Sequence, residues 1–157
     1  MSGDIEASLH KAGIKLPEPS KAAGTYVPAR ACGQFLFVSG QLPLIDGKLM
    51  VSGRVGEQVT PKQAREAARL CGCHILAQAQ AALGSLDRIT QIVKLGGFVA
   101  CRDDFTGHPG VINGASDLMV QVFGEAQGAH ARFAVGVASL PLGAPVELEA
   151  VIAFDPQ

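Results

Sequence analysis

The chain has 157 residues, which is close to the usual size of one domain with a single hydrophobic core. Hydrophobic residues make up 48% of the sequence and charged residues 17%, a balance that excludes a disordered chain. The net charge of −1 comes from 13 basic and 14 acidic residues without a basic stripe, which argues against nucleic acid as a partner. The N-terminus lacks the pattern of a signal peptide and no stretch is apolar enough to span a bilayer, so we expect a cytoplasmic protein without a membrane partner.

The first third of the sequence predicts a short helix followed by a β-hairpin. Residues 4–12 favour a helix, and residues 16–24 have the composition of a linker. We therefore expect residues 1–23 to form an N-terminal extension and residues 24–157 to form a single domain. Two apolar runs, at residues 34–44 and 47–56, meet at an Asp-Gly pair, which is a strong signal for a hairpin.

The next element is a long helix with clear start and stop signals. Thr60 is placed to cap the helix, Pro61 suits the first helical position, and Gln63 completes a capping-box pattern. Apolar residues then recur at helical spacing along one face until Gly84, which is typical of a helix end. The sequence therefore predicts a helix between residues 60 and 84.

The second half of the sequence predicts three more strands and one more helix. Residues 88–100 are rich in β-formers, and residues 111–124 have a helical pattern that ends at Gly124. Two strands, at residues 131–138 and 146–154, flank the turn sequence LPLGAP and suggest a closing hairpin. This order predicts an α+β fold, with a sheet covered by two main helices on one face and buried by self-association on the other.

The four cysteines, Cys32, Cys71, Cys73 and Cys101, could indicate disulfides or a metal site. Cys71 and Cys73 lie two residues apart on the predicted helix, so they point in different directions and are poorly placed to share one metal. Free cysteine is also among the residue types most often buried. We therefore expect four small buried thiols and no metal.

Arg132 is the most informative residue of the closing strands. Strand alternation places it on a face with only Ala134, Gly136 and Ala138. These small neighbours leave room for a planar group, and a guanidinium can bind a carboxylate through two parallel hydrogen bonds. The pattern therefore predicts an arginine that binds the carboxylate of a ligand.

The alternative for Arg132 is a structural ion pair with Glu147 or Glu149. If the closing strands form a tight hairpin, Arg132 lies opposite Ala153, and Glu147 is roughly 20 Å away along the strands. Unless the register is unusual, this distance excludes a direct pair between Arg132 and Glu147 within one chain. The two residues would then meet different groups or meet across subunits, and Glu149 has no specific role.

Two histidines and one serine are further candidates. His108 lies in a loop and His130 just before a strand, so either could act as a general base, although no histidine spacing resembles a zinc site. Ser39 is not part of the GxSxG pattern of a hydrolase nucleophile. Ser39-Gly40 instead marks a strand end, whose exposed N–H groups can bind an oxygen atom.

Several distinctive segments occur together and in a fixed order, namely FLFVSGQLP, GRVG, TPKQAREAARL, LGGFVACRDDF and NGASDLMVQVFG. The closing segment ARFAVGVASLPLGAPVELEA fits the specific pattern R-x₄-V-x₂-LP-x₄-VE-x-E. Through these segments the chain, from about Gly24 to Phe154, resembles the YjgF family, also called RidA or reactive intermediate deaminases.

The resemblance implies a chorismate-mutase-like fold assembled as a homotrimer, with pockets between subunits. It also implies hydrolysis of 2-imino and 2-enamino acids, such as 2-aminoacrylate, to 2-oxo acids and ammonia without a metal or organic cofactor. Arg132 matches the family arginine that binds the substrate carboxylate, and Glu147 matches the acid associated with the attacking water. The other matched positions line the pocket and are Tyr26, Ser39, Gly40 and Asn113.

Two other functions are compatible with the same segments. A trimer that binds small carboxylates and regulates a partner without turnover would use Arg132 but would not need Glu147 near a water molecule. Endoribonuclease activity is a label that some family members carry. The balanced charge and the absence of paired histidines disfavour it here.

Overall fold

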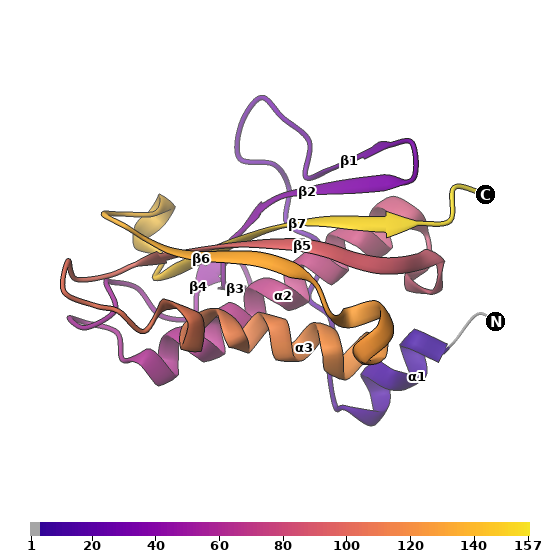
Figure 1. Cartoon of the computed structure of the whole chain (residues 1–157). Helices are drawn as coiled ribbons and strands as arrows, with labels where there is room; N and C mark the ends of the chain where they lie inside the picture. Colours follow the sequence, from indigo (N-terminus) through magenta and orange to yellow (C-terminus); the bar gives the residue numbers. More distant parts are fainter. Residues whose placement is uncertain (1–3) are drawn as a thin grey trace.

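The computed structural model describes residues 4–157 as a five-stranded sheet with helices packed against one face (Figure 1). The sheet has the order β1-β2-β7-β5-β6, and all neighbours are antiparallel except β5 and β6, which are parallel. The strands are β1 (Ala29–Cys32), β2 (Phe35–Gln41), β5 (Ile89–Ala100), β6 (Ala131–Val137) and β7 (Val146–Phe154). A separate short hairpin joins β3 (Leu44–Ile45) to β4 (Lys48–Leu49) at the predicted Asp-Gly turn.

Helices α2 (Pro61–Leu83) and α3 (His108–Gly128) lie side by side under the sheet (Figure 1). The predicted capping box is present, because the Thr60 side chain accepts a hydrogen bond from the backbone N–H of Gln63. Gly84 ends α2 in the left-handed conformation, also as predicted. Helix α3 extends beyond residues 111–124 at both ends, and the predicted stop at Gly124 is a break in helical geometry, with φ of 76°.

The short helix α1 (Asp4–Lys11) confirms the prediction for the start of the chain. Its Leu9 is buried in the core, and the backbone N–H of Ile5 donates to Asp87 in the turn η1 (Leu86–Arg88). Helix α1 therefore packs against the body of the protein. No helix within residues 4–157 is both long and apolar enough to cross a membrane.

The core lies between the sheet and the helices, which confirms the predicted α+β fold. Strand β7 shows the alternation most clearly, because every second residue from Val146 to Phe154 is buried. The opposite face of the sheet carries large apolar side chains that stay exposed in the single chain, among them Phe35, Phe37 and Val135. This open face therefore has the composition of a buried surface without a cover of its own.

The prediction that the two closing strands form a hairpin is wrong. Strand β5 lies between β6 and β7, and the connecting residues 138–145, which include η2 (Pro141–Gly143), pass over its end. The backbone N–H of Ala100 at the end of β5 donates to the carbonyl oxygen of Pro145 in this connection. Strand alternation defines which face a side chain occupies but not which strands are neighbours, and this limit explains the error.

Candidate active site

Glu147 lies on the open face of the sheet, beside an irregularity in β2. Three steps along β2, from Val38 to Gln41, match two steps along β7, so β2 contains a bulge at this point. Bulges bend a strand and redirect its side chains. A Cβ atom added to Gly40 would collide with the Glu147 carboxylate. The bulge and the missing side chain of Gly40 together provide the space that this carboxylate occupies.

The Glu147 carboxylate has an unusual electrostatic environment. It is half-buried, and within residues 4–157 it takes part in none of the ion pairs or side-chain hydrogen bonds. Burial raises the pKa of Glu147, and the neighbouring carboxylate of Glu149 raises it further. A raised pKa makes the carboxylate a stronger base, which favours the transfer of a proton to it from water.

A cavity of about 700 Å³ on the open face contains Tyr26, Ser39 and Glu149 among its lining residues. The Ser39 hydroxyl donates to the carbonyl oxygen of Val27 at 2.8 Å, and the Tyr26 hydroxyl accepts from the backbone N–H of Ala23 at 3.2 Å. Because its proton is donated to Val27, the Ser39 hydroxyl can interact with a ligand only as an acceptor, through its two lone pairs. The structure therefore places Tyr26, Ser39, Gly40 and Glu147 on one side of the sheet.

Arg132 occupies the other side, at the edge strand β6, where it faces α3. Its two terminal nitrogens donate to Ser116 Oγ at 3.0 Å and to the carbonyl oxygen of Pro109 at 3.2 Å. Asn113 is four residues after Pro109 and three before Ser116, a spacing that puts all three on one helix face. The ion pairs within residues 4–157 do not involve Arg132, so the alternative of a structural pair with Glu147 or Glu149 within one chain is wrong.

The predicted site residues thus form two groups that one chain does not bring together. Across β5, Arg132 aligns with Leu95 and Ala150, whereas Glu147 aligns with Phe98. The side chain of Arg132 therefore lies on the face of the sheet that the helices cover, and the side chain of Glu147 lies on the open face. The prediction that Arg132 and Glu147 do not pair within one chain is confirmed, although the hairpin register behind it was wrong.

Sequence reasoning missed Ser116 and treated His130 only as a candidate base. In the structure, His130 Nε2 lies 2.9 Å from Ser116 Oγ and His130 Nδ1 lies 2.6 Å from the carbonyl oxygen of Gly128. A signal for Ser116 was available, because it lies one helical turn after Asn113 on the same face. Nothing in the strand pattern indicated that this face would lie against Arg132.

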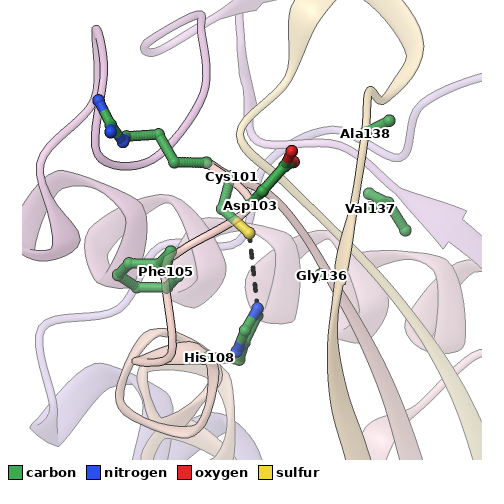
Figure 2. Close-up of a pocket in the computed structure, with 8 residues that line it drawn as sticks. Cys101, Asp103, Phe105, His108, Gly136, Val137 and Ala138 are labelled. Atoms are coloured by element: carbon green, nitrogen blue, oxygen red, sulfur yellow. Dashed lines mark hydrogen bonds between the residues drawn. The ribbon is translucent and has the colours of Figure 1, made fainter.

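A second cavity, of about 400 Å³, lies where β5 ends and α3 begins (Figure 2). His108 Nε2 is 3.5 Å from the thiol sulfur of Cys101, while the Asp103 carboxylate points away from the imidazole (Figure 2). Burial raises the pKa of Cys101, so its thiol stays protonated at neutral pH. Within residues 4–157 no group of three or more His, Cys, Asp or Glu side chains could hold a metal ion.

The expectation of four buried thiols holds for three cysteines and is wrong for one. Cys71, Cys73 and Cys101 are buried, whereas Cys32 is exposed on β1. The difference arises because Cys32 pairs with Phe35 and therefore lies on the open face of the sheet, away from the helices.

Comparison with known proteins assigns the chain to a family. The family model described as "YjgF/chorismate mutase-like, putative endoribonuclease" matches residues 6–151, so the chain belongs to this family. The protein Atu1372 from Agrobacterium tumefaciens, whose crystal structure is described as having unknown function, is 47% identical with a TM-score of 0.89, over 97% of this chain and 93% of that one.

Two further relatives are similar over nearly their whole length. A crystal structure described as a putative endoribonuclease from Shewanella oneidensis MR-1 is 35% identical with a TM-score of 0.92, over 96% of this chain and 99% of that one. Protein TCP17 from Trypanosoma cruzi is 47% identical over 151 residues, which cover 96% of this chain and 94% of that protein. The descriptions of these three relatives do not agree on an activity.

Proposed function

We propose that this protein hydrolyses reactive 2-imino and 2-enamino acids, such as 2-aminoacrylate, to 2-oxo acids and ammonia without a cofactor. One observation carries the proposal, namely that Arg132 and Glu147 are both without an oppositely charged partner within residues 4–157. An arginine without a carboxylate partner suits an anionic ligand, and a carboxyl group with a raised pKa suits proton transfer. Membership of the YjgF family is consistent with both roles.

The separation of the two groups means that a complete site requires two copies of the chain. We place Arg132 and Asn113 on one subunit of a cytoplasmic homotrimer, and Glu147 with its open-face neighbours on the next subunit. The exposed Phe35 and Phe37 on the open face support this assembly, because such side chains are buried when subunits pack. Strand β6 also ends the sheet, so its outer backbone groups can meet a second chain.

The reaction follows from the chemistry of the two groups. Arg132 holds the substrate carboxylate through parallel hydrogen bonds and thereby fixes the position of the adjacent C=N carbon. The substrate reacts as the protonated imine. The Glu147 carboxylate removes a proton from water as the oxygen bonds to the C=N carbon, and the π electrons of the C=N bond become the lone pair of an amine. Glu147 donates this proton to the amine nitrogen and then takes the proton of the new hydroxyl group as the C–N bond breaks, which leaves the 2-oxo acid and ammonia. The ammonia takes the proton from Glu147 and departs as ammonium.

The proposal is tested by coupling the protein to a pyridoxal-phosphate-dependent serine dehydratase and following pyruvate release from 2-aminoacrylate. We expect the wild type to accelerate the release, and Arg132→Ala and Glu147→Gln to remove most of the acceleration. Arg69→Ala and Glu125→Gln are matched controls, since Arg69 lies on α2 and Glu125 near the end of α3 and neither side chain hydrogen-bonds to Arg132 or Glu147, and both should stay fully active. No acceleration by the wild type, or full acceleration by Arg132→Ala, would contradict the proposal.

Calorimetry with 2-oxobutyrate separates the deaminase from a regulatory trimer that only binds carboxylates. Binding that depends on Arg132 without any turnover would favour the regulatory function. Cleavage of RNA that survives Arg132→Ala would favour the endoribonuclease description.

A further inference from the structure

Behind Arg132 lies a continuous chain of hydrogen bonds that neither the proposed chemistry nor the family resemblance uses. Arg132 Nη1 is 3.0 Å from Ser116 Oγ, Ser116 Oγ is 2.9 Å from His130 Nε2, and His130 Nδ1 is 2.6 Å from the carbonyl oxygen of Gly128. Ser116 and His130 are both half-buried. The chain thus joins the middle of α3, its C-terminal end and the start of β6.

The donors and acceptors of this chain can be assigned from chemistry. A carbonyl oxygen only accepts, so His130 Nδ1 carries a proton and donates it to Gly128. In the neutral ring Nε2 is then an acceptor, and the Ser116 hydroxyl donates to it. Arg132 is always a donor, so Ser116 Oγ receives the guanidinium N–H on a lone pair. Each hydrogen bond then has one donor and one acceptor, and the donors follow one direction, from Arg132 through Ser116 and His130 to the carbonyl oxygen of Gly128.

The same contacts fix the plane of the guanidinium. Ser116 accepts from one terminal nitrogen and the Pro109 carbonyl accepts from the other. Five N–H donors are available on an arginine, so two contacts on the helix side leave the others for a ligand. A planar group held at two points loses much of its rotational freedom before the ligand arrives, which lowers the entropic cost of binding.

We propose that Ser116 and His130 are positioning residues that hold Arg132 in the orientation required to bind the carboxylate of the substrate. His130 orients the Ser116 hydroxyl so that its lone pair faces Arg132, and Ser116 transmits this orientation to the guanidinium. The inference rests on the proposed function only in that Arg132 binds a carboxylate. It does not depend on turnover.

The first test measures the affinity for 2-oxobutyrate by calorimetry. Ser116→Ala removes an acceptor from a charged donor, and we expect an affinity about 10- to 100-fold weaker. Ser116→Thr keeps the hydroxyl and should restore most of the affinity, while His130→Phe keeps a ring without its nitrogens and should weaken it by less than Ser116→Ala. Ser8→Ala and His10→Phe on α1 are the matched controls and should bind as the wild type does.

A double-mutant cycle separates positioning from general damage. In an Arg132→Ala background, Ser116→Ala should cause no further loss of affinity, because the residue through which it acts is gone. In a Glu147→Gln background the loss should be the same as in the wild type. An equal loss in both backgrounds, or no loss from Ser116→Ala in the wild type, would overturn the inference. If the wild type binds 2-oxobutyrate but releases no pyruvate in the coupled assay, the proposed deaminase fails while this inference still stands.

A second measurement needs no ligand. Nitrogen NMR of the arginine side chains, with Arg132 assigned by the signal lost in Arg132→Lys, reports whether its terminal nitrogens rotate slowly. We expect separate, slowly exchanging signals in the wild type and in Ser116→Thr, and averaged signals in Ser116→Ala. Unchanged signals in Ser116→Ala would overturn the inference even if the protein binds no 2-oxo acid.

Discussion

Arg132 and Glu147 are held in opposite ways. The guanidinium of Arg132 is fixed by hydrogen bonds to Ser116 and to the Pro109 carbonyl, so its orientation is set by its own chain. The Glu147 carboxylate has no such partner within residues 4–157 and is placed by space alone, above Gly40. The guanidinium of Arg132 therefore has a fixed orientation, whereas no hydrogen bond in the described part of the chain holds the Glu147 carboxylate in one protonation state.

The largest effect is expected from mixing two inactive proteins. Arg132→Ala and Glu147→Gln each remove one group, but a site between subunits needs Arg132 from one chain and Glu147 from the next. If equal amounts of the two variants are unfolded and refolded together, about one quarter of the sites in a cyclic assembly receive both intact groups. The coupled dehydratase assay should then regain about one quarter of the wild-type activity per subunit.

The control for this experiment is each variant refolded alone, which should stay inactive. A mixture that also stays inactive, although native mass spectrometry shows mixed oligomers, would mean that both groups act within one chain. Arg132 and Glu147 would then not be supplied to one site by two different subunits.

A smaller loss is expected when the space above Gly40 is filled. The Cβ of Gly40→Ala would collide with the Glu147 carboxylate, and a displacement of about 1 Å in a catalytic group costs roughly 10- to 100-fold in kcat. KM for the 2-imino acid should change little, because Arg132 is unaffected. Gly110→Ala is the matched control, since a Cβ there meets nothing within 4 Å. Equal kcat values for Gly40→Ala and Gly110→Ala would show that the catalytic position of the Glu147 carboxylate does not depend on the space above Gly40.

The smallest effect concerns stability. Because folding raises the pKa of Glu147, the folded state favours the protonated carboxyl, and ionisation weakens folding as the pH rises through that raised pKa. Glu147→Gln removes this cost, so its Tm should exceed that of the wild type by about 1–3 °C at neutral pH. At pH values below the ordinary pKa of glutamate the two proteins should unfold at the same temperature.

This stability comparison requires a fixed protein concentration, because association also shifts Tm. The difference in Tm between Ser116→Ala and the wild type should not show this pH dependence, because Glu147 is intact in both proteins. A Glu147→Gln protein that is less stable at neutral pH would mean that the carboxylate has a stabilising partner in the assembly.

The helices could be predicted closely because their signals are local. Thr60, Gln63 and Gly84 mark the ends of α2 through contacts within a few residues. The order of strands in the sheet is set by packing between distant segments, so the insertion of β5 between β6 and β7 could not be read from alternation. Strand β1 was missed for a related reason, because it has four residues and no buried alternation.

For the candidate site, the residue types were predictable but their grouping was not. Arg132 stood out because it is charged among alanines and glycines, and the resemblance supplied Tyr26, Ser39 and Asn113. The division into two faces depends on the position of β5, which no local pattern encodes. Ser116 was missed because its spacing from Asn113 becomes informative only when that face of α3 is known to lie against Arg132 of the same chain.

The position of β5 between β6 and β7 also has a genetic consequence. Only 15 positions separate Arg132 from Glu147 along the chain, yet the proposed assembly uses them in different sites. Each subunit would contribute Arg132 to one site and Glu147 to another. A single subunit with a damaged closing segment would therefore impair both of the sites that it shares with its neighbours. A defective allele expressed beside a normal one would then reduce activity by more than its share of the protein.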